Sequence, residues 1–431
     1  MPASFSHVQV SYNNAMLTRR TTFRLYPTSA QERLLFEWRR LHCYLYNAAV
    51  SNRRVQYKRF GHSVDYFEQQ NSLPDFKAVW PEFVALGSQA LQATLKRVDF
   101  AYRRFFKGIG GYPKFKSIRH YSGWTYPAKA GWKALSEGKN GKLKISNLGE
   151  VKMRGQARTW GKPTTCTILY RQEKWYASIT VKCEPVRSTG LGSVGIDLGC
   201  KDAVSFSDGS KEPKPAFIAK GEQTVKVASK RLRRKRKPDG KKGIKASRRW
   251  KQEQAKVSKI QRKVTRQRQD WIHKLTSNIV SSNSLVAGEQ LTVKGMTRKA
   301  KKGSKRKKQK AGLNRSILSV GFGMIGQFLD YKLAEAGGFY VESNTRKLKP
   351  TQRCAKCWQL TPKTLSDRVH VCSNSECRHV EDRDVNAAQV NLIDAQRGGN
   401  SPSSRRATTS TDCGSMKQVA ALKRAKLLES A

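Results

Sequence analysis

Apolar residues recur with two different spacings along the chain, and the change from one to the other divides it into parts. TTFRLYP (21–27) alternates in the manner of a strand, and helical spacing then continues over residues 29–108. A capping box can begin the first helix in either of two ways, with Thr28 and Gln31 or with Ser29 and Glu32. We therefore expect a strand that leads into a helical module.

Short alternating runs broken by Gly, Lys and Asn follow between residues 109 and 188. The clearest are KLKISN, EVKMRG, TTCTILYR and KWYASITVK, and the last two predict a hairpin around Gln172–Glu173. Several short strands favour a small β-barrel. The segment 21–28 would complete this barrel, and the helical module would be an insertion in it.

Strands and helices alternate from residue 189 onward. SVGIDLG and DAVSFSDG (202–209) predict a hairpin, and a mainly helical stretch runs from Thr224 to Ser282. SLVAGE (284–289) then predicts a further strand. This alternation indicates a second domain of the α/β class.

One long helix precedes the last predicted strand. Its apolar residues have helical spacing, and Gly337–Gly338 ends it. These residues are Leu318, Phe322, Ile325, Leu329, Leu333 and Ala336. FYVES (339–343) predicts the strand, and a final helix runs from Asp384 to about Ala395.

Positive charge dominates the composition. The 431 residues include 85 Lys and Arg against 31 Asp and Glu, a formal net charge of +54. Self-repulsion on this scale opposes a compact state, so a polyanion such as nucleic acid is the expected companion. RKAKKGSKRKKQK (298–310) alone would be disordered, residues 1–20 read as a polar leader, and residues 398–431 as a loose basic tail.

Signals for export and for membrane insertion are missing from the sequence. No apolar run reaches the ~18 residues of a spanning helix, and MPASFSHVQV lacks the features of a secretory signal. The nine cysteines are an odd number and do not suggest a disulfide framework. We expect a cytoplasmic protein that binds no membrane. Nothing indicates a symmetric interface, which favours a monomer.

Three carboxylates stand out because acids are scarce in this chain. Asp197 lies in VGIDLG, Glu289 ends SLVAGE, and Asp384 opens the final helix. An acid at the end of an apolar strand lowers stability unless a cation meets it. Carboxylates of this kind can hold two Mg²⁺ ions that clamp a phosphodiester. If the fold brings the three together, they indicate a nuclease.

Four cysteines form the one tight group of the sequence and resemble a zinc ribbon. They are Cys354, Cys357, Cys372 and Cys377. The second pair is separated by four residues, which is wider than the usual gap of two. Four thiolates leave no open coordination position, so the predicted Zn²⁺ is structural. His370 and His379 are nearby alternatives as ligands.

Several further residues have plainer interpretations. Asp202 and Asp382 are acids close to the trio, interpreted as capping or salt-bridging residues, and His273 in QDWIHKL is interpreted as structural. The basic segments 230–263 and 298–310 are expected to contact nucleic acid. Most of a set of aromatic residues in the helical module are expected in its core, although aromatic side chains can also stack on unpaired bases. The set is Phe36, Trp38, Tyr44, Tyr46, Phe105 and Phe106.

Taken together, GIDLG, GEQLTVKGM, the CxxC zinc ribbon and DRDVNAA resemble the TnpB (OrfB) proteins of bacterial insertion sequences, relatives of the compact type V CRISPR effectors. The resemblance covers about residues 21–397, where RLYPTSAQERLL, RQRQDWIHKL and KPTQRCAKC also match. It implies an RNA-guided DNA endonuclease of a transposable element, with one RuvC-type, RNase H-like site. By matching position, Asp197, Glu289 and Asp384 would be its catalytic, magnesium-binding acids.

The resemblance also implies a domain plan and partners. The barrel (21–28 and 109–188) and the helical module (29–108) would be wedge and recognition domains. A nuclease domain (189–350 and 378–397) would carry an inserted zinc ribbon (351–377). The partners would be a guide RNA from the chain's own locus and double-stranded DNA with a short flanking motif, in association with the bacterial nucleoid. Base pairing with the guide would read the sequence, while the protein would read the flank.

Departures from the family pattern are the Cys372–Cys377 spacing, Trp358 where Gly is common, and the long basic segment 298–310. Two other functions compete with guided cleavage. The first is a guide-RNA-binding regulator of transposition that does not cut, as in relatives that have lost their acids. The second is a nuclease or transposase that acts without a guide. The sequence shows no context for a Tyr or Ser nucleophile, which argues against a transposase.

Overall fold

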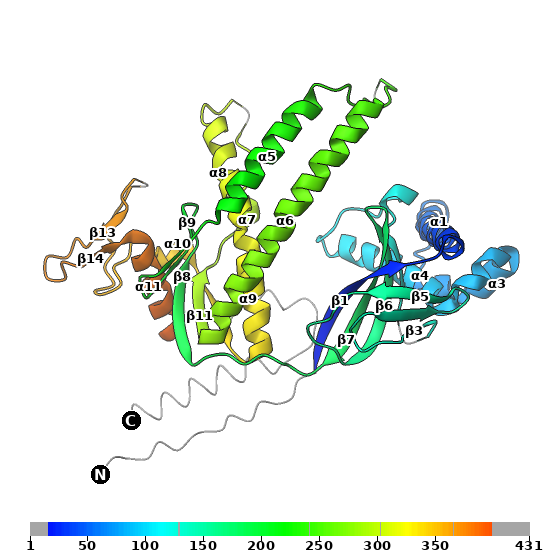
Figure 1. The fold of residues 1–431 in the computed structure, drawn as a ribbon, viewed down its shortest axis with the longest axis horizontal. Coiled ribbons are helices and arrows are strands. Elements are labelled where there is room, and N and C mark those ends of the chain that lie inside the picture. Colours follow the sequence, from blue (N-terminus) through cyan, green and yellow to red (C-terminus); the bar gives the residue numbers. More distant parts are fainter. Residues whose placement is uncertain (1–15, 128–129, 241, 302, 365, 399–431) are drawn as a thin grey trace, which may run out of the picture. The chain divides into compact units, whose positions relative to one another are not determined.

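The computed structural model describes residues 16–398 except 128–129, 241, 302 and 365. The chain divides into two compact units, with the division between Val186 and Arg187. Each unit combines helices with its own sheet, which confirms the predicted multidomain α/β fold (Figure 1). The predicted basic tail and most of the predicted leader lie outside the described residues.

The first unit contains a seven-stranded antiparallel sheet in the order β2-β6-β7-β1-β5-β4-β3. Strand β1 begins within the predicted leader and lies in the middle, where it pairs with β7 and β5. Among the described residues β2 and β3 form the two edges of the sheet and do not pair with each other. The strand order is therefore open, whereas the sequence predicts a small barrel. The strands are β1 (Leu17–Tyr26), β2 (Gly123–Tyr126), β3 (Trp132–Ala134), β4 (Gly141–Ile145), β5 (Gly149–Arg154), β6 (Lys162–Arg171) and β7 (Lys174–Cys183).

The hairpin predicted around Gln172–Glu173 is confirmed. Arg171 faces Lys174 in the register, so two residues form the whole turn. Gln172 and Glu173 have φ of 54° and 60°. Two successive left-handed residues are the type I′ geometry, whose twist matches that of the flanking strands.

The helical module lies between β1 and β2, as the sequence predicts. The Thr28 hydroxyl accepts a hydrogen bond from the Gln31 amide, and the Gln31 side-chain oxygen accepts one from the Thr28 amide, so the first of the two capping boxes is present. The Gln31 side chain also donates to the Glu150 carbonyl of β5 at 3.0 Å, which fixes the helix start on the sheet. The helices are α1 (Ser29–Phe60), α2 (Tyr66–Asn71), α3 (Leu73–Val79), the 3-10 turn η1 (Pro81–Leu86) and α4 (Ser88–Phe106).

The second unit contains a five-stranded mixed sheet in the order β10-β9-β8-β11-β12. β8 pairs with β9 in the predicted antiparallel hairpin and with β11 in parallel, and β11 pairs with β12 in parallel. Because β8, β11 and β12 run in one direction, their carboxyl ends lie at the same edge. The strands are β8 (Gly192–Asp197), β9 (Asp202–Phe206), β10 (Lys211–Pro213), β11 (Asn283–Glu289) and β12 (Phe339–Ser343).

Helices cover this sheet on both faces. The buried side chains of Val194, Ile196 and Val286 pack with those of α6 and α9 on one face, and α11 packs on the strands as well. The helices of this unit are α5 (Ala216–Arg233), α6 (Arg248–Ser282), α7 (Val293–Met296), α8 (Lys307–Val320), α9 (Phe322–Ala336), α10 (Thr345–Leu348) and α11 (Arg383–Gln396). Among the described residues, none of the helices combines the length and apolar character needed to cross a membrane.

Two predicted helical stretches are divided. The stretch from Thr224 to Ser282 is the hairpin of α5 and α6, interrupted over 234–247, and α5 begins before Thr224 (Figure 1). The prediction that the segment 298–310 is disordered is also partly wrong, because its last residues, from Lys307, begin α8. Lys310 donates to the Met296 carbonyl there at 2.6 Å.

The helix predicted through Leu318 is in fact two helices, separated at Gly321. Gly321 has φ of 85°, a left-handed conformation that ends α8 before α9 begins. Leu318 therefore does not continue the buried face of α9: in the last turn of α8, Ile317 and Val320 are buried and Leu318 is 54% exposed. Gly337 ends α9 in the same conformation, as predicted.

Candidate active site and metal centre

Asp197 is the last residue of β8, and the strand's alternation sets the face on which it lies. Gly195 precedes it by two residues and so shares its face. A Cβ at Gly195 would overlap the carbonyl of Ala388 in α11. The first glycine of GIDLG therefore permits α11 to lie directly on β8, and Asp197 follows on the same side of the sheet. Asn391 of α11 strengthens this contact by donating to the Ile196 carbonyl at 3.2 Å.

Glu289 ends the neighbouring strand, β11. Its face is fixed by Ala287, two residues earlier, which pairs with Gly195 across the parallel ladder. Asp197 and Glu289 therefore end adjacent parallel strands on the same face of the sheet. Gln290 leaves the strand with its amide bonded to the Ser343 carbonyl of β12 at 2.9 Å.

Asp384 lies in the first turn of α11, the helix that packs on that face. Asp382 caps this helix, because its carboxylate accepts from the amides of Asp384 and Val385 at 3.0 and 3.2 Å. Lys211 of β10 holds the same carboxylate through an ion pair of 2.7 Å. Asp382 therefore has both of the structural roles expected for it, and those roles keep the turn that carries Asp384 in place.

The acids lie close enough together for neighbouring carboxylates to raise the pKa values of Asp197 and Glu289. Burial raises the pKa of Asp197 well above its usual range, and the carboxylates of Glu289 and Asp384 raise it further. Burial and Asp384 raise the pKa of Glu289 to about 7. The fold thus brings together three acids that are separated by almost two hundred positions in the sequence, and the cluster resists holding three negative charges.

Arg383 provides partial compensation. Its guanidinium lies 3.1 Å from a carboxylate oxygen of Asp384, and its charge lowers the pKa of Asp197. The same side chain donates to the Asp367 carbonyl at 2.8 Å. Lys211 also lies within electrostatic reach of Asp384, but its ion pair is with Asp382. The acids therefore outnumber the cations beside them, which suits a hard divalent cation with oxygen ligands.

Asp202 and His273 do not join this cluster. Asp202 begins β9, after the tight turn in which Gly199 lies against the Asp202 carbonyl. His273 lies on α6, stacked on the Phe328 ring with centroids 4.1 Å apart, and its carbonyl accepts a bond from the buried Lys332 at 2.6 Å. These contacts agree with the structural interpretation of His273.

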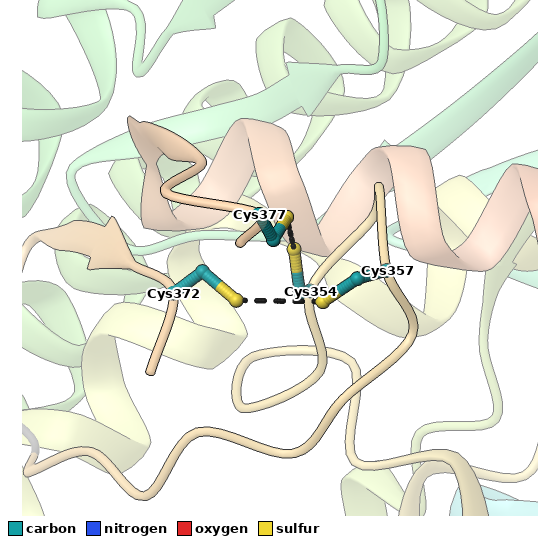
Figure 2. A group of neighbouring side chains, drawn as sticks. All are labelled: Cys354, Cys357, Cys372 and Cys377. Carbon is teal, nitrogen blue, oxygen red and sulfur yellow. Dashed lines mark hydrogen bonds between the residues drawn. The ribbon is translucent and has the colours of Figure 1, made fainter. Parts of the chain in front are cut away.

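The four predicted cysteine ligands converge. Their sulfur atoms all lie within 4.8 Å of one another, which makes them a group that could hold a metal ion. Figure 2 shows the sulfur atoms turned toward a common centre. Two contacts between the pairs are 3.8 Å for Cys354 with Cys377 and 3.4 Å for Cys357 with Cys372.

These spacings fit a tetrahedral ion bound by sulfur. Zn–S bonds of about 2.3 Å require neighbouring sulfur atoms to lie about 3.8 Å apart. The backbone amide of Gln359 lowers the pKa of Cys357 to about 7, so this thiol is readily ionised, whereas burial raises the pKa of Cys354 to about 12. The wider gap between Cys372 and Cys377 does not prevent convergence.

Each cysteine pair is followed by a residue in left-handed conformation. Trp358 has φ of 66° and Arg378 has φ of 48°. Trp358 occupies the position where the family pattern favours Gly, the residue that adopts this conformation without strain. Its ring lies beneath the guanidinium groups of Arg353 and Arg397, at 5.2 and 4.4 Å from the ring centroid. These two cation–π contacts account for a Trp at a strained position.

The two histidines considered as alternative ligands lie outside the sulfur cluster. His370 is fully buried on β13 (Val369–Val371), its Nδ1 bonded to the Lys363 ammonium. His379 comes just before β14 (Val380–Asp382), with its ring centroid 5.9 Å from that of His370. Neither is in the group of convergent metal ligands.

Asn386 is a connecting residue that the sequence reasoning did not single out, although it lies in the quoted motif DRDVNAA. Its amide nitrogen donates to the Arg353 carbonyl at 2.7 Å, and its oxygen accepts from the Ala355 amide at 3.0 Å. The side chain is fully buried. It joins the loop of the first cysteine pair to the turn that carries Asp384.

The prediction for the aromatic residues of the helical module is mostly wrong. Trp38 and Tyr46 are buried, whereas Phe36, Tyr44 and Phe106 are 37%, 55% and 74% exposed. Periodicity alone overestimates burial here because α1 and α4 each pack along one side only. Phe36 still makes edge contacts with the rings of Tyr170 and Trp175.

Family models match three parts of the chain. A family model described as "Probable transposase", of the OrfB group of IS605 elements, matches residues 176–300. A "Cas12f1-like, TNB domain" matches 322–391, which contains the cysteine cluster, and a "Helix-turn-helix domain" of the same OrfB group matches 16–62. In the structure this last range consists of β1 and the single long helix α1.

Two curated proteins are similar over most of the chain. "Putative RNA-guided DNA endonuclease InsQ" of Escherichia coli K12 is 26% identical over 78% of this chain and 82% of its own length. A "Putative RNA-guided DNA endonuclease" of Streptomyces pristinaespiralis is 27% identical over 85% of this chain and 87% of its own length. A chain of a Cas12f1–sgRNA–target DNA complex aligns over 87% of this chain and 99% of its own, at 12% identity and a TM-score of 0.31. A score at this level does not establish a shared fold.

The two units and their clustered site residues define a basic, multidomain α/β protein with a candidate metal centre. Three family models and two curated relatives match this chain, in agreement with its resemblance to the TnpB (OrfB) proteins of insertion sequences.

Proposed function

We propose that this chain is an RNA-guided DNA endonuclease of a transposable element, with a single site that hydrolyses the phosphodiester bonds of both target strands. One observation carries the proposal: in a chain with a net charge of +54, the acids that end two adjacent parallel strands lie within electrostatic reach of a third acid in the first turn of α11. Acids placed there repel a nucleic acid unless divalent cations intervene. The names of both curated relatives support guidance by RNA and DNA as the target.

The catalytic residues of this proposal are Asp197, Glu289 and Asp384, which would hold two Mg²⁺ ions. The fit rests on a donor set made only of carboxylate oxygens and on the excess negative charge that raises the pKa values of Asp197 and Glu289. When bound, the ions supply an activated water and stabilise the charge that develops on the scissile phosphate. The chain itself keeps the donors in place, two by parallel strand ends and the third by the capped first turn of α11.

The cysteine cluster has a supporting role in the proposal. Cys354, Cys357, Cys372 and Cys377 would hold one structural Zn²⁺, and four thiolates leave no position for substrate. In this plan residues 351–377 form a zinc ribbon within an RNase H-like (RuvC) nuclease domain of residues 189–350 and 378–397. The sheet of mixed direction, with two acids at parallel strand ends, supports that assignment.

The first unit would bind the guide RNA from the chain's own locus and read the flanking motif of the target. Residues 21–28 and 109–188 would be the wedge domain and 29–108 the recognition domain. The many exposed cations of the α5–α6 hairpin would follow phosphates without regard to sequence.

The test uses protein co-expressed with the flanking sequence of its own locus. Its bound RNA is sequenced, and the complex receives Mg²⁺ and plasmids that match one end of that RNA beside a randomised flank. We expect linear product confined to certain flanks. Asp197→Asn should abolish cutting and leave RNA and DNA binding intact, whereas Asp202→Asn, a nearby acid outside the cluster, should cut normally.

Other outcomes identify the competing functions. Bound RNA with intact plasmid would favour a regulator of transposition that does not cut. Cutting that persists after the RNA is removed would favour an unguided nuclease or a transposase, the activity in the description of the matched family model. If Asp197→Asn also lost RNA and DNA binding, its assignment as a catalytic residue would fail.

A further inference from the structure

A pocket of about 510 Å³ in the first unit lies apart from the acids and the cysteines. It is bounded by α1, α4 and the loop after α4, with Tyr46 and Arg97 among the residues that line it. The loop has the sequence GIGGYPKFK (108–116). The volume falls in the range of sites that bind small molecules, about 300–1,000 Å³.

The loop that forms one wall is held firmly against α1. The backbone amide of Lys116 donates to the Asn47 side chain at 2.8 Å, and the Asn47 amide returns a bond to the Lys116 carbonyl at 2.9 Å. The Cys43 thiol donates to the same carbonyl at 3.3 Å. Tyr112 is fixed further along the loop, by an edge contact with Phe105. This wall of the pocket is thus preorganised for ligand binding.

Four cations and no acid line this pocket: Arg97, Arg104, Lys114 and Lys116. In the part of the chain that the structure describes, no ion pair joins any of them to a carboxylate. Burial and the charge of Arg97 lower the pKa of Lys116, so the cations oppose one another. An anion in the pocket would relieve that repulsion.

Aromatic rings accompany the charges. Phe100 and Phe115 line the pocket and are 60% and 53% exposed, although large apolar side chains are usually covered. The guanidinium of Arg54 lies 5.2 Å from the Phe115 ring centroid and keeps that ring in place. Exposed rings beside cations that have no carboxylate partner match a ligand that has both a planar face and a negative charge.

We propose that this pocket binds one nucleotide of a single strand, with its base stacked on Phe100 or Phe115 and its phosphate among the four cations. A base inside a duplex is covered by its neighbours, so the bound nucleotide has to be unpaired or turned out of a helix. A free nucleotide has the same base and phosphate, and the experiment below distinguishes it from a nucleotide within a strand. The site contains none of the acids of the proposed endonuclease.

The test measures fluorescence with full-length protein freed of RNA, at a salt concentration that suppresses non-specific binding. The probe is a short oligothymidylate that carries one 2-aminopurine, compared with the same strand with an abasic position there and with AMP as competitor. We expect quenching of the 2-aminopurine and about tenfold weaker binding of the abasic strand. Displacement by AMP would identify a free-nucleotide site, and its failure to compete would identify a site for a strand.

Matched variants separate the pocket from the general positive surface. Phe115→Ala and Lys114→Glu should each weaken binding of the probe about tenfold, whereas Phe60→Ala and Lys58→Glu, exposed residues of α1 outside the pocket, should change it little. Equal binding of the abasic strand, or equal losses in all four variants, would overturn the proposal. Asp197→Asn should bind the probe normally, because the pocket contains none of the three acids. Failure of the pocket proposal would therefore leave the endonuclease proposal unaffected.

Discussion

Asn386 and Ala355 are joined by a hydrogen bond of 3.0 Å, in which the Ala355 amide is the donor. Ala355 lies between the first two cysteines, and Asn386 lies two residues after Asp384 in the same helix. The second bond of Asn386, to the Arg353 carbonyl, makes the connection bidentate. The sulfur cluster and the acid cluster are therefore mechanically connected through one buried amide.

Asn386→Ala should weaken both clusters. It leaves the Ala355 amide and the Arg353 carbonyl without their buried partner, a loss of about 1–3 kcal/mol. We expect faster release of zinc to a chromogenic chelator and slower target cleavage by the guided complex. Gln389→Ala, on the same helix but bonded to the Ser207 carbonyl, is the control. Unchanged zinc release in Asn386→Ala would contradict the connection.

Glu289 should make the stability of the magnesium-free protein depend on pH. Its pKa rises from about 4.5 to about 7 in the folded protein, so the native state holds this proton more tightly than the unfolded state. The free energy of unfolding should therefore fall as pH increases through this window, because the charged form is buried. Glu289→Gln should remove part of that slope and stabilise the protein at neutral pH, by on the order of 2 kcal/mol.

Urea unfolding of both proteins without added magnesium, at about pH 5 and about pH 8, measures this difference. Zinc has to be retained, so no chelator is used. If the wild type and Glu289→Gln have the same pH dependence, the burial of Glu289 that the structure indicates would be contradicted. Glu376→Gln, an exposed acid of the cysteine loop, is a matched control.

Substitutions of Trp358 can measure the free-energy cost of its left-handed backbone conformation. Trp358→Ala and Trp358→Gly both remove the contacts with Arg353 and Arg397, but only the alanine variant keeps the strain of a φ near 66°. We expect the glycine variant to be the more stable of the two by about 1 kcal/mol. Thermal unfolding of the zinc-loaded proteins would show it, and an alanine variant as stable as the glycine variant would contradict it.

Replacement of Cys372 by Ser should remove the metal from the second unit. A serine hydroxyl is a poor substitute for a thiolate, so the predicted single zinc per chain should fall toward zero in metal analysis. The unfolding temperature should decrease with it, because the cysteine loop then loses its main cross-link. Cys166→Ser, a buried thiol of the first unit, should leave the zinc content unchanged.

Binding of RNA should weaken steeply with salt, because many phosphate contacts release counterions. Arg236 and Lys237 are exposed between α5 and α6, where contact with a polyanion is unobstructed by their own unit. Their double alanine variant should lower the slope of log affinity against log salt concentration by about two. A flat salt response in the wild type would contradict the role assigned to the net charge.

Local signals in the sequence predicted much of this structure. The Thr28–Gln31 box, the Gln172–Glu173 turn and the strand that ends at Glu289 depend on neighbouring residues, and all three are found. Leu318 shows the limit, because a single left-handed Gly321 changes the helix phase and periodicity does not register it. The open order of the first sheet likewise depends on pairing between distant strands.

The candidate site divides in the same way. The cysteines were identifiable from spacing, and the acids from their scarcity and their place at the ends of elements. Their convergence depends on parallel pairing of β8 with β11 and on the approach of α11, neither of which a local pattern contains. Asn386 was missed because an asparagine inside a helix gives no sign that both of its amide atoms are bonded to a distant loop.

Gly195 and Asp197 are two residues apart, yet we expect different selective pressures to act on them. The glycine is needed for α11 to lie on β8, whereas the buried charge of the acid opposes folding and has its proposed role in catalysis. A descendant of this chain that has been repurposed as a binding protein should therefore lose Asp197 and retain Gly195. A decaying pseudogene has no reason to spare either one. The state of this pair in an insertion-sequence remnant thus offers a simple way to distinguish domestication from neutral drift.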